Sequence, residues 1–167
     1  IYKISNIENS YRNKPDPEVI FSNLPDKTHH GWKFLEFGPD GLLYIPIGAP
    51  CNICEPEEEF ATLNTLDINN PELGITKYAM GIRNTVGFDW DPKTDDLWFT
   101  DNGGDGLGDE MPADELNHAP KSGLHFGYPY IHQGDTQDPN YGTEKKAEDY
   151  IAPAQKLAPH AGAIGMA

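Results

Sequence analysis

The chain has 167 residues, a length typical of one ordinary domain. Its 27 acidic residues outweigh its 12 basic residues and give a formal net charge of −15, which excludes nucleic acid and anionic membranes as expected partners because both repel a negative surface. No run of apolar residues approaches the roughly 18 that a membrane-spanning helix requires, so no membrane span is expected.

The density of proline and glycine predicts an all-β fold. The chain contains 15 Pro and 17 Gly, spread over its whole length, and both residue types interrupt helices. Strands and turns are therefore expected nearly everywhere, and only Glu57–Thr62 favours a helix. Two polar, turn-rich segments, residues 5–18 and 132–150, are predicted to be long surface loops.

Two segments are predicted to be β-hairpins of the same kind. Phe34–Ile47 and Thr85–Thr100 are both rich in strand-forming residues around a turn that contains Asp and Pro. The two turn prolines, Pro39 and Pro92, are about 50 residues apart, a spacing typical of the repeat of one β-propeller blade. Between two and three four-stranded blades fit within the chain.

Cys51 and Cys54 form a C-x-x-C motif in the loop after the predicted strand Leu42–Ile47. A structural zinc site needs four ligands, and the chain offers a single cysteine pair. A redox-active pair normally opens a helix in a thioredoxin-like setting, which this context lacks. A local disulfide is the preferred interpretation, with two free thiols as the alternative, and a disulfide indicates a periplasmic or secreted protein.

The second hairpin leads into a loop that is rich in acidic residues and glycines. Its polar side chains are Asp101, Asn102, Asp105, Asp109, Glu110, Asp114 and Glu115. So many carboxylates repel one another unless a cation or strong donors lie among them, and glycines let backbone carbonyls turn inward. The sequence thus predicts a hard-cation site, with Ca²⁺ as the preferred ion, against the alternative of a solvated turn. A helix–loop–helix calcium site is excluded, because Pro112 stands where its bidentate glutamate is required.

Four further histidines and two tryptophans are predicted to be structural. The histidines lack acidic or cysteine neighbours at ligand spacing, and they are His118, His125, His132 and His160. Trp90 and Trp98 alternate with polar residues and are expected in blade cores. Trp32 is a weaker candidate for a position on a channel wall.

Several short phrases occur in a fixed order between His29 and Pro129. They are His29-His30, Gly38-Pro39-Asp40-Gly41, Ile47-Gly48, Gly81-Ile82-Arg83-Asn84, Gly87-Phe88, Leu97–Asn102, Asp114-Glu115-Leu116-Asn117 and Gly127-Tyr128-Pro129. In this order and spacing the phrases resemble the glucose/sorbosone dehydrogenase family, soluble quinoproteins that use pyrroloquinoline quinone (PQQ). The segment Leu157–Met166 resembles the family more weakly and looks like the start of a further blade.

The resemblance implies a six-bladed β-propeller with PQQ at the mouth of its central channel. Residues 1–167 then form one partial propeller domain, a fragment with about two to three of the four-stranded blades. An open arc of blades exposes strand edges and apolar faces. Two interpretations follow: a second copy completes the ring as a homodimer, or the sequence is a truncated part of a longer chain.

The resemblance also assigns roles to single residues. His30 takes the place of the family's catalytic base, and His29 stands where members usually carry Asp. Arg83 and Asn84 match the pair that contacts PQQ, and Asn102 occupies a position close to the cofactor and the cation. A neutral imidazole suits removal of a hydroxyl proton near neutral pH, and a guanidinium offers paired donors to the carboxylates of PQQ.

The acidic loop is assigned to the metal by the same resemblance. Gly103 and Gly104 match the positions whose backbone carbonyls bind Ca²⁺, and Asp114 and Glu115 match the acidic pair that closes the loop around it. A cation placed against the quinone oxygens acts as a Lewis acid and stabilises developing negative charge.

The implied function is PQQ- and Ca²⁺-dependent oxidation of an aldose or related sugar at C1, with electrons passed to an external acceptor, in the periplasm or outside the cell. Two alternatives stay open: a catalytically silent propeller module that binds Ca²⁺ or a partner, and a calcium-dependent lactonase-type propeller hydrolase. The first would give no spectral change with PQQ, and the second would hydrolyse lactones without it.

Overall fold

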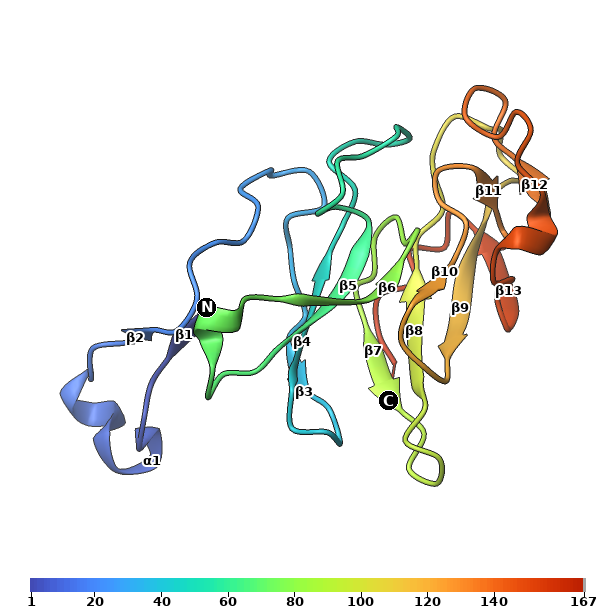
Figure 1. Cartoon of the computed structure of the whole chain (residues 1–167). Helices are drawn as coiled ribbons and strands as arrows, with labels where there is room; N and C mark the ends of the chain where they lie inside the picture. Colours follow the sequence, from blue (N-terminus) through green and yellow to red (C-terminus); the bar gives the residue numbers. More distant parts are fainter. Residues whose placement is uncertain (167) are drawn as a thin grey trace.

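The computed structural model describes residues 1–166 and consists almost entirely of strands and turns (Figure 1). The strands are β1 (Tyr2–Lys3), β2 (Glu18–Val19), β3 (Glu36–Phe37), β4 (Leu43–Ile47), β5 (Thr62–Leu66), β6 (Thr76–Met80), β7 (Phe88–Trp90), β8 (Leu97–Asp101), β9 (Ala113–Ala119), β10 (Leu124–His125), β11 (Ile131–His132), β12 (Thr136–Gln137) and β13 (Gln155–Pro159). The helical turns are α1 (Ile7–Ser10), η1 (Tyr11–Asn13), η2 (Pro71–Leu73) and η3 (Ala147–Asp149). Across these described residues, no helix has the length and apolar character needed to cross a membrane.

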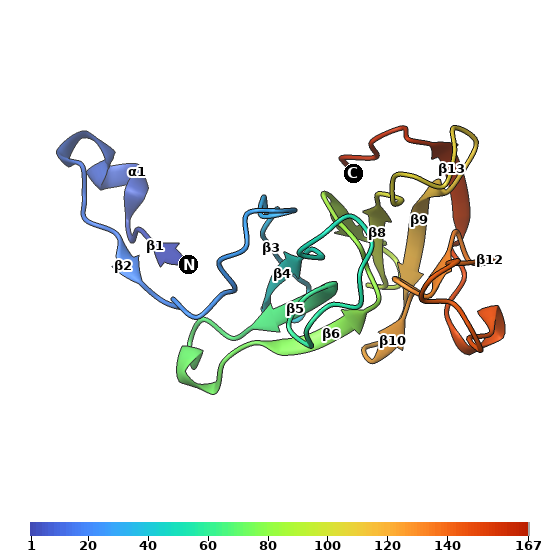
Figure 2. The same ribbon diagram turned by 90° about the horizontal axis from the view of Figure 1, so that it is seen from above.

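Two sheets stand side by side as consecutive blades (Figures 1 and 2). The first has the strand order β10-β6-β5-β4-β3, and its strands β3 to β6 form an antiparallel meander. The second has the order β13-β9-β8-β7 and is antiparallel throughout. Pro39 lies in the turn between β3 and β4, and Pro92 in the turn between β7 and β8. The all-β fold and the repeat of two hairpins are therefore confirmed.

The two sheets share one hydrophobic core between them. Its buried members are Tyr44, Leu63, Ala79, Ile82, Phe88, Leu97, Phe99, Ala119 and Phe126. Trp90 packs against this core as predicted, with its ring centroid 5.5 Å from that of Phe88. Trp98 does not, because it alternates with the core residues of β8 and stacks on His118 at 4.4 Å instead.

Strand β4 is buried on both faces, which explains its unbroken run of nonpolar residues. Tyr44 faces the core between the sheets, whereas Leu43, Ile45 and Ile47 alternate with it and face the other side. There they belong to a second cluster that also takes in residues of the N-terminal segment, namely Ile1, Phe21 and Leu24. The rest of this segment, with β1, β2 and α1, projects away from the blades (Figure 2).

Strand β10 joins the two blades. After β9 the chain crosses to the first sheet, where Leu124 pairs with Ala79 and His125 with Met80 in parallel. It then forms the small β11–β12 hairpin, and β13 returns to the outer edge of the second sheet beside β9. Because β10 pairs with β6 at the edge of the first sheet, it partly covers the backbone hydrogen-bonding groups of β6.

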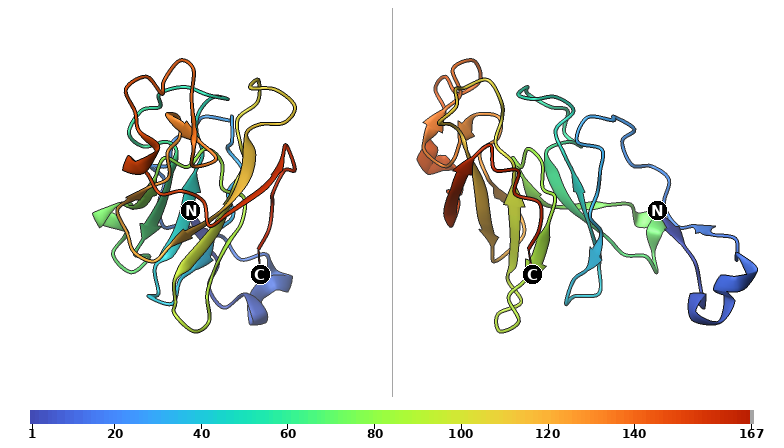
Figure 3. Two further views of the ribbon diagram at one scale, coloured as in Figure 1. Left: turned by 90° about the vertical axis from the view of Figure 1, so that its right-hand side faces the viewer. Right: turned by 180° about the vertical axis from the view of Figure 1, so that it is seen from behind.

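The loops that carry the predicted site residues all leave the strands at the same end of the molecule, opposite the turns at residues 38–41, 91–96 and 120–123 (Figures 1 and 3). They are the segment before β3, the connection from β4 to β5, the β6–β7 turn and the β8–β9 loop. The meander brings them together, because in antiparallel strands every second connection falls at the same end of a sheet.

Four local predictions need correction. Residues 57–61 form turns and no helix, and β5 begins at Thr62. The predicted loop at residues 5–18 contains α1 and η1, and the predicted loop at 132–150 contains β12 and η3. Asp114 and Glu115 lie in β9, not in a loop. Of the phrase Leu157–Met166, residues 157–159 belong to β13, the outer strand of the second blade, so a further blade can begin only after them.

Candidate functional site

Asp101 holds the backbone of the turn formed by Arg83 and Asn84. It is the last residue of β8, is buried, and its carboxylate oxygens accept hydrogen bonds from the backbone amides of Arg83 (2.8 Å) and Asn84 (2.6 Å). Burial raises the pKa of Asp101 to about 7, although the two amide donors oppose the shift. The β6–β7 turn is thereby tied to the end of β8.

The guanidinium of Arg83 is held by oxygens from two loops. Its Nε donates to the carbonyl of Asn52 at 2.8 Å and its Nη2 to Oδ1 of the same residue at 2.9 Å, while Nη1 donates to the carbonyl of Asn102 at 3.2 Å. A carboxylate oxygen of Asp105 lies 3.8 Å from Nη2. Only 8 % of the Arg83 side chain is exposed, so its planar group is fixed in one orientation.

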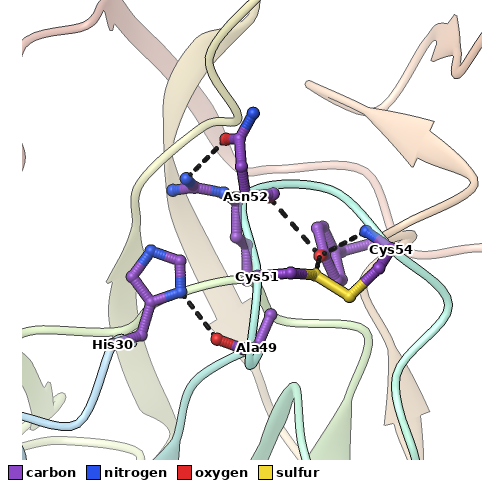
Figure 4. Close-up of a disulfide and its surroundings, with 7 residues drawn as sticks. His30, Ala49, Cys51, Asn52 and Cys54 are labelled. Atoms are coloured by element: carbon purple, nitrogen blue, oxygen red, sulfur yellow. Dashed lines mark hydrogen bonds between the residues drawn. A yellow bond between two sulfur atoms is a disulfide. The ribbon is translucent and has the colours of Figure 1, made fainter. Parts of the chain in front are cut away.

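Cys51 and Cys54 form the predicted disulfide (Figure 4). The Tyr128 hydroxyl lies 3.4 Å from the Cys51 sulfur and accepts a hydrogen bond from the backbone amide of Cys54 at 3.1 Å. The disulfide closes a short loop that carries Asn52 between the two cysteines. In Figure 4 the disulfide and His30 lie on opposite sides of this loop.

His30 is held in one orientation by the residue that precedes this loop. Its Nδ1 is 2.9 Å from the carbonyl oxygen of Ala49, and because a carbonyl only accepts, Nδ1 carries the proton and donates. Nε2 then keeps its lone pair. Burial, followed by the positive charge of Arg83, lowers the pKa of His30 to about 4. The ring is therefore neutral at neutral pH, as a proton acceptor must be.

The pKa of His30 can be tested directly. In an NMR titration of the imidazole resonances in calcium-free buffer, assigned with a His30→Gln variant, we expect His30 to protonate with a pKa of about 4. Arg83→Ala is expected to raise this pKa, because one of the charges that opposes protonation is removed. A wild-type pKa at the ordinary value of 6.5 would contradict the assignment.

Asn102 connects three segments at the end of β8. Its Oδ1 accepts a hydrogen bond from Nδ2 of Asn84 at 3.2 Å, and its own Nδ2 donates to the carbonyl of Ala163 at 2.8 Å. Its carbonyl also accepts the bond from Arg83. The structure thus brings together three predicted residues, Arg83, Asn84 and Asn102, by direct contacts.

Gly103 and Gly104 open the acidic loop directly after Asn102. The backbone amide of Gly103 donates to Oδ1 of Asp114 at 2.9 Å, and Oδ2 of Asp114 accepts from the amide of Ala163 at 3.0 Å. Within residues 1–166, no hydrogen bond ends on the carbonyl oxygens of Gly103 or Gly104. Two adjacent backbone oxygens are therefore free to bind a hard cation.

Glu115 lies opposite Asp101 across the β8–β9 ladder, near the start of the strand that follows the acidic loop. Burial, and then the charge of Asp101, raises the pKa of Glu115 to about 8. Its Oε2 accepts a hydrogen bond from Asn117 at 2.9 Å. In the described part of the chain, no group of three or more His, Cys, Asp or Glu side chains is arranged to hold a metal. A cation site made mainly of carboxylates is therefore disfavoured.

A small cavity of about 20 Å³ lies between these loops, and it is lined by residues that include Arg83, Asp101, Gly103, Glu115 and His132. Pockets that hold small-molecule ligands measure roughly 300–1,000 Å³, so this cavity does not hold a cofactor. The exposed side of the loops at this end of the blades is the better candidate for a wall of a larger site.

Sequence reasoning missed several residues of this site. Asn52 and Tyr128 contact the site through long-range bonds, and the only sequence signal for Asn52 is its position between two cysteines. His132 was expected to lack an acidic partner, but its Nε2 lies 2.9 Å from Asp138 in a buried pair. His118 and His160 also lie near carboxylates, those of Asp96 and Asp105.

Comparison with known proteins identifies the family of this arrangement. The family model described as Glucose / Sorbosone dehydrogenase matches residues 64–167. An uncharacterized protein from Borreliella burgdorferi is 33% identical over 153 residues, which cover 88% of this chain and 39% of the relative.

Two solved structures are similar in fold. The holo form of a pyranose dehydrogenase PQQ domain from Coprinopsis cinerea has a TM-score of 0.75 at 15% identity, with 92% of this chain and 48% of that chain covered. A calcium structure of a carbohydrate-active enzyme from Trichoderma reesei has a TM-score of 0.81 at 16% identity, with 98% and 52% covered. The chain thus spans about half the length, or less, of the proteins it matches.

Proposed function

Because the chain belongs to the glucose/sorbosone dehydrogenase family, we propose that it is the part of a quinoprotein that oxidises an aldose or related sugar at C1 with PQQ and Ca²⁺. One observation carries the proposal. His30 and the Arg83 guanidinium both bond to backbone carbonyls of the segment Ala49–Asn52, at one end of two adjacent blades. Arg83 also bonds to the carbonyl of Asn102, which directly precedes the free carbonyls of Gly103 and Gly104. This set matches the three needs of the reaction: a base, an anion-binding group and a cation site.

His30 is the proposed base. The Nδ1–H bond to Ala49 fixes the tautomer, so Nε2 can accept the proton of the C1 hydroxyl as hydride leaves C1. The low pKa keeps this nitrogen unprotonated over the neutral range. In place of the aspartate that family members usually carry before this histidine, the carbonyl of Ala49 orients the ring.

Arg83, Asn84 and Asn102 are the proposed cofactor contacts. A guanidinium has five N–H donors, and three of those of Arg83 are used by Asn52 and Asn102. Two donors remain for a carboxylate, which is the anionic group that PQQ presents. The similar fold of a pyranose dehydrogenase PQQ domain from Coprinopsis cinerea supports the proposal.

The carbonyls of Gly103 and Gly104 are the proposed calcium ligands. Their oxygens fit a hard cation, and Asp114 supports them from behind through the Gly103 amide. Asp114 and Glu115 follow this loop directly in β9, and Glu115, whose pKa burial raises to about 8, is proposed to support the loop mainly in its protonated form. When bound, PQQ supplies the hydride acceptor and Ca²⁺ supplies a Lewis acid. We further propose an external electron acceptor and a periplasmic or secreted location, for which the disulfide is the structural support.

A catalytically silent module that binds Ca²⁺ or a partner is the second candidate. The observation that favours it is that the cavity between the site loops is about 20 Å³, too small for a cofactor. We also propose a homodimer in which a second copy completes the ring of blades. The mass of the protein in solution, measured by light scattering, tests the homodimer.

An equilibrium titration of the chain with PQQ, followed by quinone absorbance with and without Ca²⁺, tests the function. We expect saturable binding that requires Ca²⁺ and that Arg83→Ala weakens by at least about tenfold, because hydrogen bonds to a charged group are lost. Arg12→Ala, which removes an exposed arginine of the N-terminal segment, is the matched control and should bind as the wild type does. Absence of binding by the wild type would reject the cofactor proposal in favour of the silent module.

A further inference from the structure

Asn52 uses both its backbone and its side chain to hold Arg83. The carbonyl accepts from Nε at 2.8 Å and Oδ1 accepts from Nη2 at 2.9 Å, so a single residue binds the guanidinium in a paired geometry. Paired hydrogen bonds fix the plane of a guanidinium as well as its position. Asn52 itself is exposed, so this contact is not a by-product of core packing.

The same side chain also binds the glycine-rich loop. Oδ1 of Asn52 accepts from the backbone amide of Asp105, and Nδ2 donates to the carbonyl of Asp105, both at 2.8 Å. Asn52 therefore connects Arg83 to the loop that carries Gly103 and Gly104. One exposed amide links the proposed anion-binding group to the proposed cation-binding loop.

The disulfide determines where Asn52 lies. Cys51 and Cys54 flank it, and Tyr128 anchors the closed loop through the Cys51 sulfur and the Cys54 amide. On the N-terminal side, the amide of Ala49 donates to the carbonyl of Arg83 at 2.8 Å. The segment from Ala49 to Cys54 is thus fixed at both ends, and it also supplies the carbonyl that orients His30.

We propose that Asn52, held in its loop by the Cys51–Cys54 disulfide, is the positioning residue that orients the Arg83 guanidinium towards an anionic cofactor carboxylate. The inference rests on the proposed function for the identity of that cofactor. In this proposal the disulfide holds Asn52 in place, and Asn52 in turn orients the Arg83 guanidinium. The two remaining N–H donors of Arg83 then bind the ligand.

The first test is binding of PQQ in Ca²⁺ buffer by a set of variants. Asn52→Ala is expected to bind about tenfold more weakly than the wild type. Asn23→Ala, a control at an exposed asparagine of the N-terminal segment, should bind like the wild type. The double variant Cys51→Ser/Cys54→Ser is expected to lose affinity in the same direction. Adding Asn52→Ala to it should cause little further loss, because both changes act through the same contact.

The second test needs no cofactor. The chain has two arginines, Arg12 and Arg83, so their guanidinium N–H resonances can be assigned with Arg12→Lys and Arg83→Lys variants. The Nη2–H of Arg83, which donates to Oδ1 of Asn52, should exchange slowly with solvent in the wild type and faster in Asn52→Ala and in the cysteine variant. The Nε–H keeps its acceptor in Asn52→Ala, because that acceptor is the backbone carbonyl of residue 52. The Arg12 resonance should not change in any of these variants.

The two tests separate the possible failures. If the wild type binds PQQ and Asn52→Ala binds equally tightly, the positioning role is overturned. Unchanged exchange of the Arg83 Nη2–H in Asn52→Ala overturns it as well. If the wild type does not bind PQQ, the proposed function fails, and the exchange measurement alone then decides whether Asn52 orients Arg83. Full additivity of the cysteine and Asn52 effects overturns the link through the disulfide.

Discussion

Phe88→Ala is expected to lower the free energy of unfolding by about 3–5 kcal/mol, as is typical when a buried phenylalanine is truncated. Phe88 is 1% exposed and lies in the core between the two blades. Its ring centroid is 5.0 Å from that of Phe34, which precedes the first sheet, and 6.2 Å from that of Tyr44 in β4. The cavity would therefore open at the contact that joins the blades, where little can collapse to fill it.

Urea-induced unfolding followed by tryptophan fluorescence measures this effect. Phe37→Ala is the matched control, because Phe37, in strand β3 of the other sheet, is a phenylalanine whose exposed fraction is 52%. Its replacement is expected to change stability by less than about 1 kcal/mol. Equal losses in both variants would show that the shared core does not hold the blades together.

In calcium-free buffer, the stability of the chain is expected to fall as the pH rises from about 6.5 to about 8, above the range in which the lowered pKa of His30 acts in the opposite direction. Burial raises the folded-state pKa of Glu115 from 4.5 to about 8 and that of Asp101 from 3.8 to about 7. The folded state thus binds these protons more tightly than the unfolded state does. Their contribution is complete below the unfolded pKa values and is lost as the pH rises through the folded ones.

Glu115→Gln should flatten this pH dependence, because glutamine is neutral at every pH and relieves the repulsion with Asp101 across the ladder. The variant is expected to melt at a higher temperature than the wild type near pH 8, measured by circular dichroism. Glu72→Gln, at an exposed glutamate in η2, should keep the wild-type slope. A wild-type stability that rises over the same range would contradict the raised pKa values.

Much of the site could be anticipated from the order of short phrases. Arg83, Asn84, Asn102 and Gly103 were predicted together, and the structure links the first three and places Gly103 directly after them. Each of these residues lies in a connection that follows or precedes a strand of a repeated hairpin. Once the hairpins are recognised, the end of the blade at which each connection lies is determined by the alternating direction of the strands.

Other contacts could not be predicted, because they join segments that are distant in sequence. Tyr128 contacts Cys51 across 77 positions, and Asn52 contacts Asp105 across 53. The acidic residues 101, 114 and 115 looked like a solvated or cation-filled loop. In the structure all three are buried at the start of the β8–β9 ladder. Backbone amides bind Asp101 and Asp114, and burial raises the pKa of Asp101 and of Glu115.

By itself the sequence determined the all-β class, the two repeated hairpins and the order of the site phrases, since each depends on local alternation, on turn residues and on their spacing. It favoured a disulfide between Cys51 and Cys54 because two cysteines three positions apart had no better partners. Only the tertiary structure decided that this disulfide presents Asn52 to Arg83 and Ala49 to His30. That arrangement depends on packing two blades around one core, and no local pattern encodes which loops then meet.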